Sequence, residues 1–256
     1  MEVSLIQLDI SWESPMENYT KVESLLKRTS PSVGSLVLLP EMFPTGFSMN
    51  GEKLSYTGME SPESFLSRSA HDLKCWISAG VGVLNSDGKF YNQQIVLNPE
   101  GDCIARYSKI RLFKSGGEDV LFHAGSEVVM TSINEWRVAP LICYDLRFPE
   151  LFREVARKGA ELFLVVANWP TTRLEHWRIM LQSRAIENQA FVIGVNRCGS
   201  DPDRDYPGHS MVIGPQGEIL AEAGEEEVVL RAEIDRQKLL SWRKEFSALR
   251  DFIERA

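Results

Sequence analysis

The sequence predicts an α/β protein built as a four-layer α-β-β-α sandwich of two mixed sheets with pseudo-two-fold halves. The first observation is a strand–helix–strand order at the start of the chain, which requires parallel strands. The second is that a meander of antiparallel strands follows. Both patterns, the strand–helix–strand unit and the meander, recur in the second half. No stretch rich in Gly, Ser or Pro divides the halves, so we expect one domain over residues 1–256.

Composition limits the classes of partner. The 256 residues are 43% hydrophobic and carry a formal charge of −8. The acidic excess argues against binding to nucleic acid or to an anionic membrane, so small molecules are the expected partners. The stretch MEVSLIQLDISWE carries acids where a secretory signal carries basic residues, and no apolar run approaches the roughly 20 residues of a membrane span. We therefore expect a cytoplasmic protein.

Several common catalytic motifs are missing from the sequence. The four cysteines lie tens of residues apart without a CxxC pair, and no histidine belongs to an HExxH motif. The sequence therefore indicates no disulfide framework, metal site or cofactor. GxSxG and phosphate-loop motifs are missing as well, which disfavours an α/β-hydrolase and a nucleotide-binding site.

The chain begins with strand-like runs over 3–10 and 35–42. Between them, Ser14 and Pro15 are typical of a helix start, and Glu17 has the spacing of a capping box. The apolar stripe that we expect this helix to pack on the sheet comprises Val22, Leu25 and Leu26.

A second helical pattern over 61–75 precedes three apolar runs. An Asp-Gly pair and the stretch 98–101 supply turn residues between these runs, which predicts an antiparallel meander ending at Lys109. The stretch 110–127 has neither helical nor strand periodicity, and we expect a long loop. Long loops often carry function.

The second half repeats the alternation of strands and helices. Its expected elements are a strand over 138–143, a helix from Pro149 to Lys158 capped by Gly159, a strand over 161–169, a helix over about 173–188 and a strand over 190–196. Three strands joined by turns follow in the stretch 209–234. The tail, about 236–256, is charged, and we expect it to pack on a neighbouring subunit.

Three reactive side chains follow strand-like runs. Glu41 comes after SLVLLP, Lys109 after IARYS, and Cys143 after APLI. Because ligands bind beyond the carboxyl ends of strands in open α/β folds, the three can converge on one site. Taken singly, each has a more ordinary role, since a cysteine usually fills a core and charged residues usually lie at the surface.

The chemistry of the three residues is coherent if they meet. A thiol with a pKa of about 8.5 is mostly protonated at neutral pH and needs a base or a cation to become nucleophilic. Glu41 can take the proton of Cys143 and return it to a leaving amine. Lys109 can hold the developing oxyanion together with a backbone N–H, such as that of Tyr144.

Three segments, in this order, resemble the signature segments of the nitrilase superfamily of carbon-nitrogen hydrolases: LLPEMFPTGF, YSKIRLF and LICYDLRFPELF. The resemblance spans essentially the whole chain. It implies a cysteine-dependent amidase with Glu41, Lys109 and Cys143 as catalytic set, on an αββα sandwich that forms a homodimer. It also implies that a second glutamate, Glu118 in FKSGGEDVLF, orients the substrate or the attacking water.

Within this superfamily, CYDLRFPELFR, ANWP and SRAIENQ are most similar to the ω-amidase branch. The similarity implies release of ammonia from the terminal amide of 2-oxo acid amides such as 2-oxoglutaramate and 2-oxosuccinamate. Such substrates carry a carboxylate, which requires a cation. The candidate cations are Arg147 and Arg111, with Arg173, His176 and Arg178 behind them, and the aromatic residues expected to wall the pocket are Phe43, Tyr144 and Trp169. The alternative role for Arg147 is a contact with Asp145 that holds the turn.

Other functions fit parts of the same pattern. A hydrolase of carbamoyl amino acids or aliphatic amides, or a true nitrilase, would keep the catalytic set and change only the pocket. A papain-like cysteine hydrolase would instead need His176 or His209 at Cys143. A non-catalytic protein that binds a small molecule is the alternative from a different class, because a fold alone does not confer activity.

Overall fold

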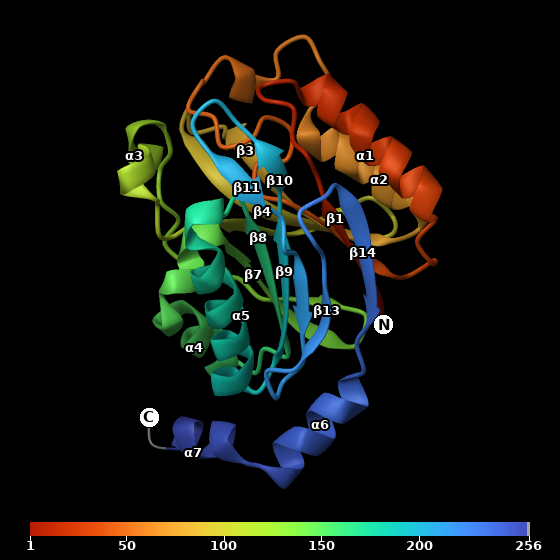
Figure 1. The fold of residues 1–256 in the computed structure, drawn as a ribbon, viewed down its shortest axis with the longest axis vertical. Coiled ribbons are helices and arrows are strands. Elements are labelled where there is room, and N and C mark those ends of the chain that lie inside the picture. The colour runs from red at the N-terminus through yellow and green to blue at the C-terminus, as the bar shows by residue number, and fades with distance from the viewer. Residues whose placement is uncertain (255–256) are drawn as a thin grey trace.

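Two six-stranded mixed sheets make up the centre of the computed structural model, which describes residues 1–254 (Figure 1). The strands of the first sheet, in spatial order, are β14 (Val228–Glu233), β1 (Glu2–Gln7), β2 (Leu36–Leu39), β3 (Trp76–Leu84), β4 (Phe90–Leu97) and β5 (Cys103–Ser108). Those of the second sheet are β13 (Ile219–Glu222), β12 (Met211–Ile213), β9 (Phe191–Asn196), β8 (Leu162–Ala167), β7 (Trp136–Ile142) and β6 (Thr131–Ile133).

The two sheets have the same internal order, which confirms the prediction of two similar halves. Each has three parallel strands at its centre, β1–β2–β3 in one and β7–β8–β9 in the other. An antiparallel strand borders the first parallel strand of each sheet, β14 beside β1 and β6 beside β7. Two antiparallel strands follow the third, β4 and β5 after β3, and β12 and β13 after β9. The strand β14 belongs to the second half of the sequence yet pairs with β1 over six residues, from Glu2 opposite Glu233 to Gln7 opposite Val228.

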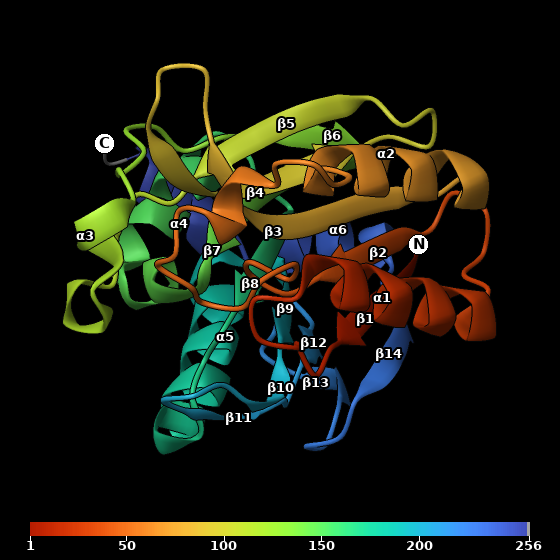
Figure 2. The ribbon, with the colours of Figure 1, turned by 90° about the horizontal axis from the view of Figure 1, so that it is seen from above.

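Helices cover the outer face of each sheet. The helices are α1 (Pro15–Thr29), α2 (Pro62–Leu73), the short α3 (Glu118–Leu121), α4 (Pro149–Arg157), α5 (Leu174–Asn188), α6 (Arg236–Glu245) and α7 (Ala248–Glu254). Figures 1 and 2 show α1 and α2 side by side on the first sheet, and Tyr19 of α1 stacks on Phe65 of α2 with ring centroids 4.3 Å apart. The helices α4 and α5 cover the second sheet.

Alternating side chains of the central strands enter different cores. In β2, Leu36 and Leu38 pack between the two sheets, whereas Val37 and Leu39 pack under α1 and α2. All four are fully buried. Strands covered on both faces are expected to be apolar throughout, which explains the continuous apolar runs in the sequence.

Two local predictions need correction, and some short strands were not predicted. Ser14 does not cap α1 with its side chain, because its hydroxyl donates to Trp12 O, and Glu17 accepts from Ser11 instead of closing a capping box. The loop 110–127 contains a 3-10 turn over Lys114–Gly116 and the helix α3. The sequence also gave no sign of β6 or of the hairpin formed by β10 (Cys198–Ser200) and β11 (Asp205–Pro207).

The C-terminal tail forms two helices that lie beyond the ends of the strands and contact the segments just before β8 and β9 (Figure 1). Leu239 of α6 is fully buried, and Arg243 donates to the backbone oxygens of Gln189 and Ala160. The last two residues of the predicted tail, 255 and 256, lie outside the described residues. Contact of this tail with a neighbouring subunit stays a prediction.

Gly80 in β3 lies directly against the turn that follows β2. A Cβ atom on Gly80 would come within 2.4 Å of Glu41 Cα and 2.9 Å of Met42 N, and neither backbone atom can move alone. We expect Gly80→Ala to lower the free energy of unfolding by about 1–3 kcal/mol, because the turn must shift. Urea denaturation measures this change.

Gly224 offers a matched control, because it is exposed and a Cβ atom there meets no atom within 4 Å. The change in unfolding free energy for Gly224→Ala should stay within about 0.5 kcal/mol. If both variants unfold at the same urea concentration, the close approach at Gly80 is not a constraint.

Candidate active site

Cys143 lies at the tightest point of the connection between β7 and α4. Its φ angle is 44°, in the left-handed region that residues with a side chain rarely adopt. A 3-10 turn over Cys143–Arg147 follows at once and leads into α4 at Pro149. Strained backbone of this kind persists only where neighbouring groups hold it.

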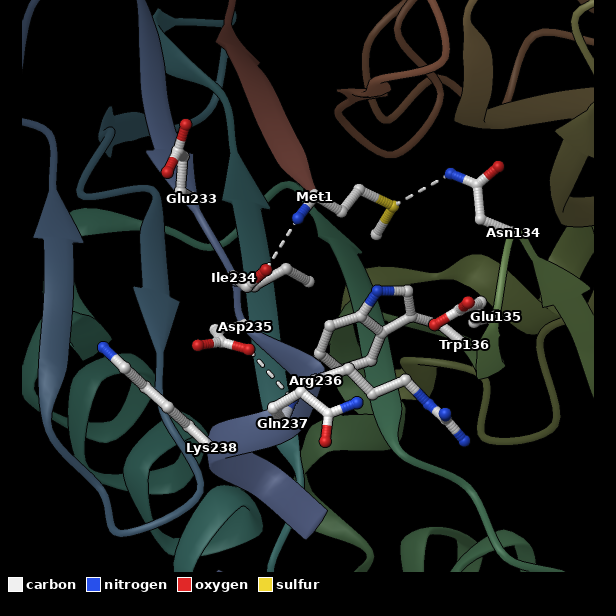
Figure 3. Close-up of a pocket in the computed structure, with 10 residues that line it drawn as sticks. All are labelled: Met1, Asn134, Glu135, Trp136, Glu233, Ile234, Asp235, Arg236, Gln237 and Lys238. Carbon is white, nitrogen blue, oxygen red and sulfur yellow. Dashed lines mark hydrogen bonds between the residues drawn. The ribbon is translucent and has the colours of Figure 1, made fainter. Parts of the chain in front are cut away.

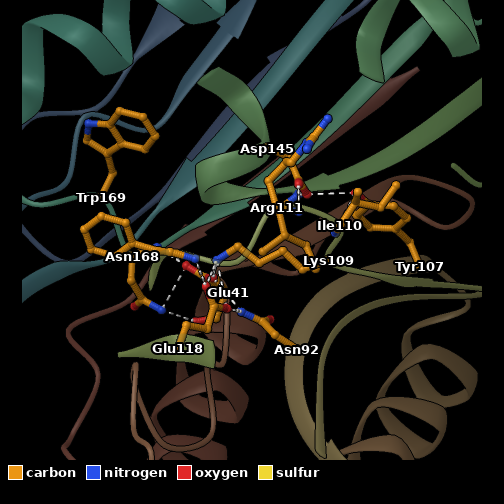
Figure 4. Close-up of polar contacts among 12 residues, drawn as sticks. Glu41, Asn92, Tyr107, Lys109, Ile110, Arg111, Glu118, Asp145, Asn168 and Trp169 are labelled. Carbon is orange, nitrogen blue, oxygen red and sulfur yellow. Dashed lines mark hydrogen bonds and ion pairs between the residues drawn. The ribbon is translucent and has the colours of Figure 1, made fainter. Parts of the chain in front are cut away.

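Lys109 lies between two carboxylates in the interior (Figure 4). Its Nζ atom is 2.8 Å from Glu41 Oε1, 3.0 Å from Glu118 Oε1 and 2.9 Å from Glu118 Oε2. The three side chains are at most 1% exposed. Glu41 lies in the turn after β2, Lys109 directly follows β5, and Glu118 begins α3.

Two asparagines that the sequence analysis did not single out complete this cluster. Asn92 Nδ2 donates to Glu41 Oε1 and to Glu118 Oε1, both at 2.7 Å. The backbone N–H of Asn168 donates to Glu41 Oε2 at 2.8 Å, and its side chain donates to Glu41 O. The available signals were the polar run YNQQ inside an otherwise apolar strand, and the position of Asn168 directly after β8.

The net effect of burial and of the charges of this cluster is to raise the pKa values of Lys109 and Cys143. Burial disfavours the Lys109 ammonium, but the charges of Glu118 and Glu41 outweigh it and raise the pKa of Lys109. Burial raises the pKa of the Cys143 thiol well above its usual value, and Glu41 adds to this rise while Lys109 opposes it. The resting thiol is therefore protonated at neutral pH and needs a base to react.

Cys143 and Lys109 line one small cavity of about 20 Å³, enough for about one water molecule. Its other walls come from segments that follow strands of both sheets and from the β10–β11 hairpin, and they include Phe47, Phe113, Asn168, Arg173, Arg204 and Tyr206. A substrate of several heavy atoms must therefore displace part of this wall as it enters.

The side chains predicted to bind the substrate carboxylate lie in different places relative to this cavity. Arg173 lines the cavity. Arg147 stacks on Trp169 with its guanidinium carbon 4.9 Å from the ring centroid, and burial together with the charge of Arg173 lowers the pKa of Arg147. His176 Nδ1 is 3.3 Å from Arg147 Nη2. In the described part of the chain, no carboxylate forms an ion pair with Arg147, Arg173 or Arg204.

Arg111 and Arg178 do not reach this cavity. Arg111 is paired with Glu150 at 3.1 Å, outside the cavity, and only its backbone N–H contacts Asp145. Arg178 is paired with Glu222 at 3.0 Å. Ion pairs with acidic neighbours therefore hold both residues elsewhere.

Two predicted aromatic walls also lie elsewhere. Phe43 is fully buried and packs on Tyr19 and Phe65 under α1 and α2, because the turn after Glu41 directs it to the helical side of the first sheet. Tyr144 lines a neighbouring cavity with Phe148. Trp169 contributes indirectly, since its ring supports Arg147 and its Nε1 donates to Arg173 O.

A much larger hollow of about 630 Å³ lies between the β6–β7 turn and the start of α6, at Met1, Trp136 and Arg236 (Figure 3). The Met1 ammonium donates to Ile234 O, and Arg236 is bound to Glu161 through two nitrogens. Neither the lysine–carboxylate cluster nor a cysteine borders it. Size alone therefore does not identify the reactive site.

Among the described residues, the histidines form neither a catalytic pair with Cys143 nor a metal site. His209 Nδ1 contacts Glu222 at 2.8 Å, and His176 contacts Arg147, so the contacts described for residues 1–254 join neither to Cys143. Over the same residues no group of three or more His, Cys, Asp or Glu side chains is arranged to hold a metal ion. No helix in this range has the length and apolarity to span a membrane.

Comparison with known proteins agrees with this geometry. The carbon-nitrogen hydrolase family matches residues 2–244. The chain is 39% identical to the 2-oxoglutaramate amidase of Bacillus subtilis (strain 168), over 92% of this chain and 91% of that protein. It is 35% identical to the omega-amidase YafV of Yersinia enterocolitica, over 98% and 96% respectively.

A solved structure shares the fold. It is a CN-hydrolase superfamily protein from Xanthomonas campestris with an arsenic adduct in its active site, and it is 34% identical with a TM-score of 0.90, covering 98% of this chain and 96% of that chain. Sequence match, fold and relatives all agree, and the chain belongs to the carbon-nitrogen hydrolase family.

Proposed function

We propose that this protein is an ω-amidase, which hydrolyses the terminal amide of small 2-oxo acid amides such as 2-oxoglutaramate and 2-oxosuccinamate and releases ammonia. The observation that carries the proposal is one cavity that is lined by Cys143, Lys109 and two arginines, Arg173 and Arg204. The relatives from Bacillus subtilis and Yersinia enterocolitica, which are named 2-oxoglutaramate amidase and omega-amidase, support the proposal. They are 39% and 35% identical to this chain over more than nine-tenths of its length.

In the first half of the reaction, Cys143 forms a thioester. Glu41 takes the thiol proton as the sulfur attacks the amide carbon, and the carbonyl oxygen becomes an oxyanion. Lys109 and a backbone N–H beyond the cysteine, that of Tyr144, hold this oxyanion. Glu41 then passes its proton to the amide nitrogen, the C–N bond breaks, and ammonia leaves.

In the second half, water breaks the thioester. Glu41 takes a proton from the water molecule as its oxygen attacks the thioester carbon, and Lys109 again holds the oxyanion. The C–S bond breaks, and the sulfur recovers its proton from Glu41. The products are a carboxylic acid and the original enzyme, so no external reductant or cofactor is consumed.

Glu118 keeps Lys109 charged during this cycle. When Glu41 is protonated it no longer compensates the ammonium, but Glu118 remains 2.9 Å from Nζ. Its Oε2 also accepts the Phe113 N–H at 2.6 Å, which fixes it in place. Asn92 holds the two carboxylates together through one amide nitrogen. This assigns Glu118 an electrostatic role beside any role in orienting water.

The substrate class follows from the cations. A 2-oxo acid amide carries a carboxylate at the end opposite to its amide, and guanidinium groups without an acidic partner suit such an anion. Arg173 and Arg204 border the cavity, and Arg147 lies beside Arg173. Arg204 comes from the turn between β10 and β11, so this hairpin would contribute a cation to the carboxylate end of the substrate.

We further propose one catalytic domain that works in the cytoplasm as a homodimer. The four cysteines are free, as is usual in a reducing compartment. Ile179 and Ile186 lie two turns apart on α5 and are 58% and 55% exposed, which suits a face covered by a second copy.

Cys143→Ala should bind 2-oxoglutaramate but release no ammonia, because no thioester can form. An enzymatic ammonia assay measures turnover, and calorimetry measures binding. Cys103→Ala is the matched control, since Cys103 lies in β5 away from the cavity, and it should keep full activity. Undiminished turnover by Cys143→Ala would rule out the covalent mechanism.

Arg173→Gln should lower kcat/KM for 2-oxoglutaramate by about 10–100-fold, the value of a charge-assisted hydrogen bond, and spare an uncharged aliphatic amide. Arg111→Gln is the control, because its partner is Glu150 outside the cavity. The panel should include glutamine, asparagine and a carbamoyl amino acid. A preference for the carbamoyl substrate, or an equal loss on the uncharged amide, would contradict the assigned substrate class.

Ile179→Glu combined with Ile186→Glu should convert the homodimer into a monomer, because each copy would bury two charges in the interface. Sedimentation velocity measures the mass of both forms. A wild-type monomer at micromolar concentration would disprove the dimer without touching the proposed chemistry.

A further inference from the structure

We propose that Asp145 is a positioning residue that couples the Lys109 segment to the Cys143 turn and so sets the alignment of ammonium and thiol. The proposal rests on the proposed function, because it assigns Asp145 the task of aligning the two groups that perform the chemistry. The role expected of Asp145 from the sequence was only a contact with Arg147 within the turn.

The Asp145 carboxylate joins two segments from opposite sheets (Figure 4). Its Oδ2 accepts the Tyr107 hydroxyl at 2.8 Å and the Ile142 N–H at 3.0 Å, and its Oδ1 accepts the Arg111 N–H at 2.9 Å. Tyr107 and Arg111 lie two residues before and two residues after Lys109. Ile142 directly precedes Cys143. The Asp145 side chain thus contacts the segment that carries Lys109 and the segment that carries Cys143.

The surroundings make these contacts rigid. Asp145 and Tyr107 are fully buried, so water cannot replace a lost hydrogen bond. The strained φ of 44° at Cys143 also needs a compensating interaction, and the bond from Ile142 N–H to Asp145 spans that residue. The Cys143 conformation and the position of Lys109 therefore depend on one carboxylate.

Only an ionised carboxylate accepts all three bonds fully. Burial raises the pKa of Asp145 to about 6, while the Lys109 ammonium and the hydrogen bonds oppose the rise, so the group is ionised above about pH 7. An asparagine would place its NH₂ group against a backbone N–H in either orientation, that of Ile142 or that of Arg111. Substitution by asparagine keeps the volume and breaks the coupling.

Asp145→Asn is the main test, measured above neutral pH with 2-oxoglutaramate. We expect kcat to fall about 100-fold with little change in KM, because the reacting groups are misaligned while the cavity arginines stay in place. The rate of Cys143 alkylation by iodoacetamide should fall about tenfold, and peptide mass spectrometry separates Cys143 from the other three cysteines. This second measurement needs no turnover.

Glu161→Gln is the matched control. Glu161 is also a buried carboxylate with three hydrogen bonds, from the Arg137 N–H and two nitrogens of Arg236, but it lies at the opposite end of β8. Both variants should melt at a lower temperature, and only Asp145→Asn should lose kcat and Cys143 reactivity. Equal losses of kcat in the two variants would show a general loss of stability and would overturn the proposal.

Tyr107→Phe provides a milder variant if Asp145→Asn does not fold. It removes one of the three bonds and keeps the ring, so kcat should fall about tenfold at unchanged KM. Full kcat in Asp145→Asn, or in Tyr107→Phe where Asp145→Asn does not fold, would overturn the positioning role while an inactive Cys143→Ala upheld the amidase mechanism. An active Cys143→Ala would instead remove the proposed chemistry, and the alkylation rates would still decide whether Asp145 positions the thiol.

Discussion

Taking an ammonium group out of water costs several kcal/mol unless opposite charges replace the lost hydration, and the structure around Lys109 meets that requirement. Its side chain is 1% exposed, with Glu41 and Glu118 both within 3.0 Å of Nζ. Each carboxylate is fixed by a backbone N–H from a different segment, Asn168 for Glu41 and Phe113 for Glu118. Compensating one buried charge therefore determines where segments from both sheets must lie.

The same arrangement explains why the thiol stays neutral at rest. Among Lys109, Glu41 and Glu118, two carboxylates and one ammonium leave one excess negative charge, and a thiolate at Cys143 would add a second. Transfer of the Cys143 proton to Glu41 moves that charge from one group to the other without changing the total. Because the total charge stays constant, the protein needs no large electrostatic reorganisation during the step.

Short-range sequence patterns predicted most helices and strands and the reactive residues at their ends. Packing between distant segments decided which other side chains reach the site. Glu41, Lys109 and Cys143 each follow a strand, so their place at the sheet ends could be read from the sequence, while the family resemblance supplied their grouping. Asn92 lies within a strand, where a polar residue usually faces solvent, and its buried partners, Glu41 and Glu118, come from segments far away in the sequence.

Packing also decided which aromatic and cationic side chains reach the cavity. Phe43 follows Glu41 by two residues, yet the turn directs it under α1 and α2. Arg204 and Tyr206 reach the cavity on the β10–β11 hairpin, a polar stretch without periodicity that gave no reason to expect them there. The pairing of β14 with β1 has a consequence for biosynthesis, because the first sheet acquires its edge strand only after residue 233 has left the ribosome. A nascent chain therefore carries an incomplete sheet with an unpaired strand edge through most of translation, and such an edge is prone to aggregation.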